Sequence, residues 1–133
     1  MAIVARDVLQ HAHNLDEALK IVRAAKVFVS TIWLVGSRAD GKFIVVEKTP
    51  DVTNVREAIG DSIVCPNHFE TDGLKAMAQN TNYMAEATSL AREQRLTELL
   101  KQNNGTVDAA HSVKFLRDRD LPGGVFEIGR AHV

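Results

Sequence analysis

The feature that most constrains the fold is a pair of runs rich in β-branched and aromatic residues, joined by a tight turn. The runs are VFVSTIWLVGS at residues 27–37 and KFIVVEKT at residues 42–49. The intervening RADG ends in Asp40-Gly41, a dipeptide that favours a β-hairpin turn. Pro50 ends the second run because proline has no N–H to donate to a strand ladder. The sequence therefore predicts an antiparallel hairpin.

Two further short runs extend this pattern. VTNVREA at residues 52–58 and SIVC at residues 62–65 flank a turn signal at Gly60-Asp61. Consecutive short strands usually pair with their sequence neighbours. We therefore expect four strands in one antiparallel sheet.

Helical signals lie on both sides of these strands. Asn14 followed by Glu17 resembles a capping box that opens a helix at Leu15, and a shorter helix is expected at residues 6–12. Residues 70–83 are polar and predict a loop. Helices then follow at 84–102 and 107–117, with stop signals at Asn104-Gly105 and in LPGG at 121–124. The order predicts an α+β fold, with helices on an antiparallel sheet.

Composition excludes several classes of protein. The chain has 133 residues, the length of one domain, and its composition is that of a soluble globular protein. A net charge of −1 with no Lys/Arg cluster argues against a nucleic-acid partner. No apolar run approaches the roughly 20 residues that span a bilayer. A single cysteine excludes an internal disulfide and a multi-cysteine zinc site, and it leaves the compartment open.

Both ends of the chain indicate truncation. Helical periodicity begins at once, whereas EIGRAHV at residues 127–133 continues no pattern. That heptapeptide can be encoded by GAG ATC GGA AGA GCA CAC GTC, a string that resembles the start of a common sequencing adapter. We therefore expect residues 1–126 to be a fragment of a single domain and residues 127–133 to be read-through. The alternative is a genuine short tail.

VCPNHFET at residues 64–71 raises the question of a thiol nucleophile. In an extended strand, the side chains of Cys65 and His68 would lie on opposite faces. No Asp or Asn is placed to orient the histidine, and a lone cysteine in an apolar run is more often a small core residue. The histidines fall on different elements, so no metal site is expected.

Two polar residues offer sharper candidates. Asn67 follows a predicted strand, and its side-chain amide could serve an oxyanion hole or cap a loop. Arg92 lies on the predicted inward face of a helix, at i−4 and i−7 from Leu96 and Leu99. It either snorkels over the core edge or reaches a polar site.

Five segments in order carry a resemblance that covers about residues 3–120: RDVLQHAHNLDEALKIVRAAK, GKFIVVEKTP, PNHFET, REQRLTELL and VKFLRDR. They resemble the C-terminal part of the acyl-coenzyme A:6-aminopenicillanic acid acyltransferase family. This family comprises peptidase C45-like, autoproteolytic acyltransferases and hydrolases related to choloylglycine hydrolases. The chain has Pro66 where the family usually has threonine.

The resemblance implies part of an αββα N-terminal-nucleophile (Ntn) hydrolase fold. It further implies a small-molecule amide or thioester substrate, a cysteine nucleophile freed by self-cleavage, and no cofactor or metal. Asn67 would then be an oxyanion donor, Arg92 would line the pocket, and Cys65 would not be the nucleophile. The nucleophile would lie upstream, which makes the fragment inactive alone. The alternative is a self-contained α+β binding or interaction module without catalysis.

Overall fold

The computed structural model describes residues 2–103, 106–119 and 125, and it divides the chain into two compact units, Met1–Cys65 and Pro66–Val133. Helices and a three-stranded antiparallel sheet are both present, so the predicted α+β class is confirmed. None of the helices in the described part of the chain is both long and apolar enough to cross a membrane.

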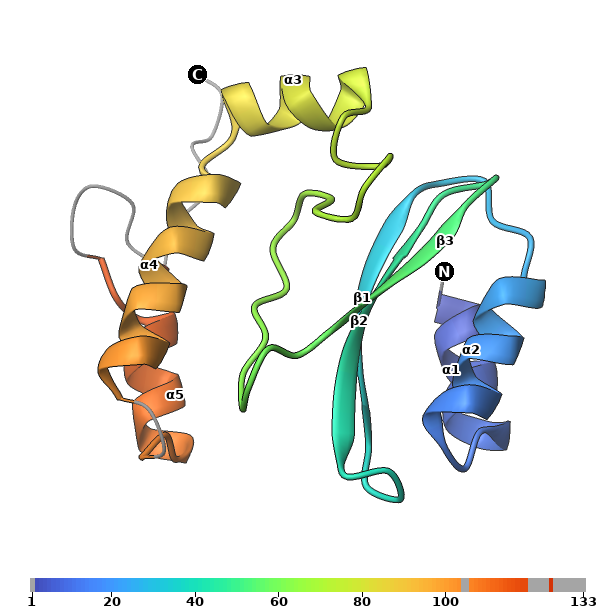
Figure 1. Ribbon diagram of the computed structural model, residues 1–133, viewed down its shortest axis with the longest axis horizontal. Helices are drawn as coiled ribbons and strands as arrows, with labels where there is room; N and C mark the ends of the chain where they lie inside the picture. The colour runs from blue at the N-terminus through green and yellow to red at the C-terminus, as the bar shows by residue number, and fades with distance from the viewer. Residues whose placement is uncertain (1, 104–105, 120–124, 126–133) are drawn as a thin grey trace. The chain divides into compact units, whose positions relative to one another are not determined.

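The first unit is a sheet with two helices on one face (Figure 1). Its elements are α1 (Ala2–His11), α2 (Leu15–Ala24), β1 (Thr31–Ser37), β2 (Lys42–Lys48) and β3 (Thr53–Glu57), with strand order β1-β2-β3. The core cluster consists of Leu15 and Val22 of α2 with Ile44 and Val46 of β2. These apolar side chains recur at helical spacing in α2 and at alternate positions in β2. The intervening Val45 and Glu47 are fully buried as well, so β2 is buried on both faces.

The hairpin predicted from the sequence is confirmed. Strands β1 and β2 pair from Thr31↔Lys48 to Ser37↔Lys42, and Gly41 occupies the turn with φ of 61°. This left-handed conformation favours glycine, which has no Cβ to clash.

The hairpin turn is tied to the start of α2 through Asp40. The Leu15 N–H donates to the Asp40 carboxylate over 2.8 Å and so satisfies one of the unpaired donors of the first helical turn. A hydrogen bond from the Ser37 side chain, together with this backbone bond, lowers the pKa of Asp40 below its ordinary value.

The predicted cap of α2 is also confirmed. The Asn14 side chain accepts the Glu17 N–H over 2.9 Å, and the Glu17 carboxylate accepts the His13 N–H over 2.8 Å. Helix α1 begins at Ala2, earlier than the predicted 6–12. Val4 and Val8, one turn apart, both pack on the core, which favours the longer helix.

The expected fourth strand at residues 62–65 does not form. Within the described residues only an isolated bridge, Ile59↔Ser62, occurs there. The Val64 carbonyl instead accepts a hydrogen bond from Arg56 Nη2 over 3.0 Å, while Arg56 Nε lies 3.4 Å from the fully buried carboxylate of Glu47. This arginine therefore takes up a backbone acceptor that a further ladder would have used.

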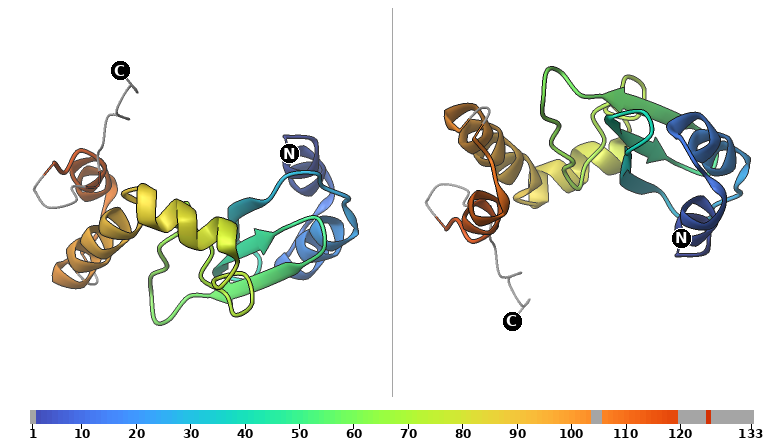
Figure 2. Two further views of the ribbon diagram at one scale, coloured as in Figure 1. Left: turned by 90° about the horizontal axis from the view of Figure 1, so that it is seen from above. Right: turned by 90° about the horizontal axis from the view of Figure 1, so that it is seen from below.

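The described residues of the second unit form the helices α3 (Ala78–Glu86), α4 (Ser89–Gln102) and α5 (Ala109–Leu116). Helices α4 and α5 lie side by side (Figure 2). The guanidinium of Arg95 on α4 forms two hydrogen bonds, of 2.9 and 3.0 Å, with the carboxylate of Asp118, which follows α5. A paired geometry of this kind fixes orientation as well as distance.

Two predictions for this unit were wrong. Residues 70–83 are not all loop, because α3 begins at Ala78, and the predicted helix 84–102 is interrupted at Ala87, whose backbone is extended. The interruption frees Ser89 to begin a new helix. The stop signals at 104–105 and 121–124, and the segment 127–133, lie outside the described residues.

Candidate functional site

The most informative segment is the tripeptide that opens the second unit. Asn67 is exposed, whereas its neighbours Pro66 and His68 are both buried. The backbone is thus anchored on each side of a single outward-facing amide. Asn67 is the residue for which the family resemblance implied an oxyanion role, and that role stays a prediction.

The first turn of α4 anchors Asn67 and His68. Ser89 Oγ accepts the Asn67 N–H over 3.1 Å and lies 2.9 Å from His68 Nδ1. The other ring nitrogen, Nε2, lies 3.2 Å from Glu93 Oε2. Ser89 and His68 are 2% and 3% exposed, so this chain of contacts is shielded from water and correspondingly stronger.

A second buried side chain secures the loop that follows. Asn80 of α3 accepts the Phe69 N–H over 2.7 Å and donates to the carbonyls of Phe69 and Lys75 over 3.0 and 3.1 Å. This one amide therefore satisfies backbone groups that a loop would otherwise leave unpaired. The loop that follows Asn67 is held by hydrogen bonds to two helices.

Arg92 lies on α4, one turn after Ser89, and is half-buried. Its Nε is buried and has no hydrogen-bond partner among the described residues. An unpartnered buried donor costs free energy. In the described part of the chain, no hydrogen bond joins Asn67 to Arg92, and their shared pocket stays a prediction.

Sequence reasoning missed Ser89, Glu93 and Asn80. Ser89 lay inside a predicted continuous helix, and Asn80 lay inside a predicted loop, so neither position suggested a tertiary partner. The available signal was the helix-start preference of serine, which marks Ser89 as a residue near a helix N-terminus. The pairing of residues some twenty positions apart leaves no local pattern.

The same cluster contains the side chains that could hold a metal ion. Ligand atoms of His68, Glu70 and Glu93 lie within 4.8 Å of one another. One nitrogen and two carboxylate oxygens would suit a divalent transition metal. His68 Nε2 and Glu93 Oε2 also contact each other directly, at 3.2 Å, without a metal ion.

Cys65 is the last residue of the first unit and is half-buried. It forms no disulfide within the described residues. Its expected role as a core residue rather than a nucleophile stays a prediction.

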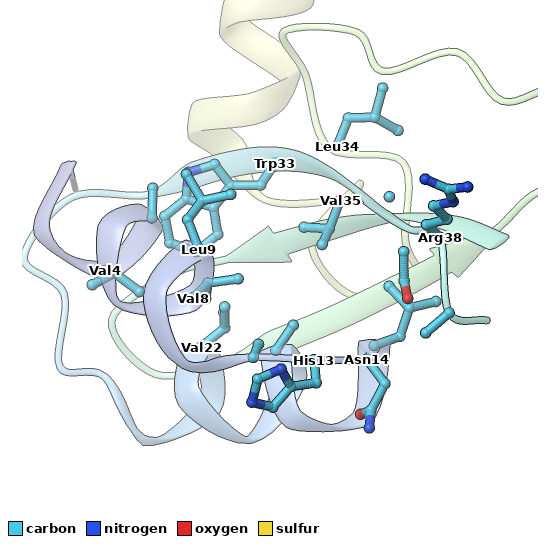
Figure 3. Close-up of a pocket in the computed structure, with 17 residues that line it drawn as sticks. Val4, Val8, Leu9, His13, Asn14, Val22, Trp33, Leu34, Val35 and Arg38 are labelled. Atoms are coloured by element: carbon cyan, nitrogen blue, oxygen red, sulfur yellow. The ribbon is translucent and has the colours of Figure 1, made fainter. Parts of the chain in front are cut away.

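A pocket of about 800 Å³ lies in the first unit, between α1, α2 and β1. Figure 3 shows Val4, Val8 and Leu9 of α1 opposite Trp33 and Val35 of β1. Its wall is mainly apolar and also includes His13, Asn14 and Arg38. The pocket offers volume and apolar surface but no obvious catalytic pair.

The fold and the site together define an α+β protein with a helix-anchored loop that presents an asparagine amide. Comparison with protein families gives the particular family. The model for acyl-coenzyme A:6-aminopenicillanic acid acyl-transferase matches residues 1–132, and the chain belongs to this family. No curated protein and no solved structure matches the chain.

The family match confirms the resemblance found in the sequence. It indicates an acyltransferase-type function and small-molecule substrates. The match extends over both compact units, so the asparagine loop and the hairpin both belong to the family pattern.

Proposed function

We propose that the chain is a fragment of a cysteine-dependent Ntn acyltransferase or amide hydrolase and supplies the oxyanion side of its active site. The observation that carries the proposal is the exposed Asn67, held between buried Pro66 and His68 and bonded through its N–H to Ser89. A donor on a fixed backbone stabilises developing charge without reorganising during the reaction.

The reaction begins at a cysteine upstream of residue 1, freed as a new N-terminus by self-cleavage. Its α-amino group, with an ordinary pKa of about 7.7–8.0, takes the thiol proton. The sulfur then bonds to the carbonyl carbon of an amide or thioester, and the carbonyl π electrons move to the oxygen. As this intermediate collapses, the leaving amine or thiol takes the proton, and the acyl group then passes to water or to an amine.

Asn67 and Arg92 act on the oxygen side of this reaction. The Asn67 side-chain N–H donates to the oxyanion, and Arg92 lines the same pocket. Arg92 is half-buried on the same helix as Ser89, which is the anchor of Asn67, and this placement supports the assignment. No cofactor or metal is required.

The proposal extends to the fold and the domain limits. The sheet with α1 and α2 on one face would be part of an αββα sandwich. Residues 1–126 would be a fragment of that single domain, and residues 127–133 would be adapter read-through.

A second function is favoured by one observation. The largely apolar pocket of about 800 Å³ in the first unit has the size of small-molecule sites, which span about 300–1,000 Å³. A self-contained binding module without catalysis would bind its ligand in this pocket, and Asn67 would have no catalytic role.

The test is to locate the acyl group. The protein extended upstream to include the cleaved cysteine is incubated with an acyl thioester, quenched in acid and digested for mass spectrometry. We expect the acyl group on the new N-terminal cysteine and none on Cys65. An acyl group on Cys65 would refute the assignment of the nucleophile, and absence of any acyl-enzyme or product would favour the binding module.

A further inference from the structure

We propose that His68 is a positioning residue. Through Ser89, it fixes the backbone of Asn67 and so sets the direction in which Asn67 presents its side-chain amide. The catalytic consequence rests on the proposed function, whereas the positioning itself is a property of this chain. The contacts of His68 with Ser89 and Glu93 have no role in the reaction described above. They lie directly beside the residue on which that reaction depends.

The hydrogen bonds of the cluster have one consistent direction when His68 is neutral. The Asn67 N–H can only donate, so Ser89 Oγ accepts it. A carboxylate can only accept, so His68 Nε2 donates to Glu93. Nδ1 of a neutral ring must then accept, and the Ser89 hydroxyl donates to it.

The resulting chain runs from the Asn67 N–H through the Ser89 hydroxyl and the His68 ring to the Glu93 carboxylate. Every donor points the same way, and hydrogen bonds aligned in this manner polarise and strengthen one another. The Glu93 carboxylate, two contacts further along, therefore strengthens the hydrogen bond between the Asn67 N–H and Ser89.

The geometry of α4 makes this cluster rigid. Ser89 and Glu93 are separated by four residues and lie on one face of the helix. The His68 ring contacts both, so its two nitrogens are held by points on a single helical element. Because His68 is covalently linked to Asn67, and Asn67 bonds to the same Ser89 oxygen, a change in the ring's contact with Ser89 moves the asparagine.

The first measurement uses the unaltered chain. Nitrogen-15 NMR of the imidazole at neutral pH should give a protonated Nε2 and an unprotonated Nδ1 for His68. The opposite tautomer would reverse the direction of the hydrogen bonds, and a ring protonated at both nitrogens would leave Nδ1 unable to accept from Ser89; either result would overturn the proposal.

Variants at His68 separate positioning from simple packing. In place of histidine, an asparagine side chain puts its polar atoms near the position of Nδ1. A glutamine side chain puts them near the position of Nε2. His68→Asn should keep the hydrogen bond to Ser89, whereas His68→Gln should keep only the contact with Glu93. We expect the backbone N–H of Asn67 to exchange with solvent roughly fivefold to tenfold faster in His68→Gln than in His68→Asn.

A purely structural role predicts equal exchange in the two variants, and equal rates would refute the proposal. Glu93→Gln should also speed exchange at Asn67, because it removes the charge that strengthens the chain. Its matched control is Glu98→Gln on the same helix, whose carboxylate is 62% exposed and pairs only loosely, at 3.7 Å, with Arg95. We expect no change at Asn67 in that control.

In the extended enzyme, His68→Gln should lower kcat by about 10- to 100-fold and leave KM unchanged, and His68→Asn should restore most of the loss. An effect confined to KM would contradict positioning. If the enzyme proves inactive while the NMR results hold, the proposed function fails and the positioning stands. If activity is present but the exchange rates do not separate, the positioning fails alone.

Discussion

Expressed as residues 1–133, the protein should turn over neither amides nor thioesters, and Cys65→Ala should leave that baseline unchanged. The reason is that the proposed nucleophile is an N-terminal cysteine outside this segment. Removing the nucleophile from a catalytic unit costs roughly a millionfold in kcat. No residual activity should therefore be detectable above the uncatalysed rate.

The assay follows release of free thiol from an acyl thioester, with the upstream-extended protein as the positive control. A segment that does turn over substrate, and loses that activity on Cys65→Ala, would show that Cys65 is the nucleophile. That outcome would remove both the upstream nucleophile and the assignment of Cys65 as a core residue. Activity that survives Cys65→Ala would point to another catalytic group within the segment.

Asn67→Ala, made in the extended enzyme, should lower kcat by about 10²–10³ and leave the melting temperature unchanged. The loss in kcat follows because a preorganised oxyanion donor acts only when charge develops on the carbonyl oxygen. The melting temperature should hold because the Asn67 side chain is exposed, and its backbone N–H still donates to Ser89. Steady-state kinetics and calorimetry on the same preparations measure both quantities.

Asn82→Ala is the matched control for this variant. Asn82 is an exposed asparagine on α3, and its side chain makes no hydrogen bond within the described residues. The control should leave kcat and stability unchanged. An equal loss of kcat in both variants, or a fall in melting temperature for Asn67→Ala, would mean that Asn67 supports the fold rather than the reaction.

Local patterns predicted the hairpin and the start of α2 correctly. The Asp40-Gly41 turn and its flanking runs predicted β1 and β2, and Asn14 with Glu17 predicted the start of α2. These features depend on residues close in sequence, where turn chemistry and capping act directly.

Prediction failed where a distant partner decides the local structure. The strand expected at 62–65 gives way because Arg56 engages the Val64 carbonyl. The helix expected from residue 84 is interrupted, and Ser89 begins α4 with its hydroxyl bonded to His68 and Asn67. Neither contact leaves a periodic signal in the sequence. A prediction from residue propensity alone therefore adds a strand at 62–65 and continues one helix through Ser89.

The candidate site divides in the same way. Asn67 and Arg92 could be singled out from the sequence because they carry chemistry and match family segments. Ser89, His68 and Glu93 could not be joined into one cluster, since serine, histidine and glutamate at these spacings have many ordinary roles. Their arrangement depends on how the loop docks against α4, which is a tertiary property.

We propose that this chain supplies the oxyanion side of an acyltransferase active site. The most direct measurement is a crystal structure of the extended enzyme with an inhibitor that forms a tetrahedral adduct on the nucleophilic cysteine. We expect the Asn67 side-chain nitrogen to lie about 2.7–3.1 Å from the adduct oxygen, with Arg92 lining the same pocket. An adduct oxygen held by other donors, with Asn67 beyond hydrogen-bonding distance, would contradict it.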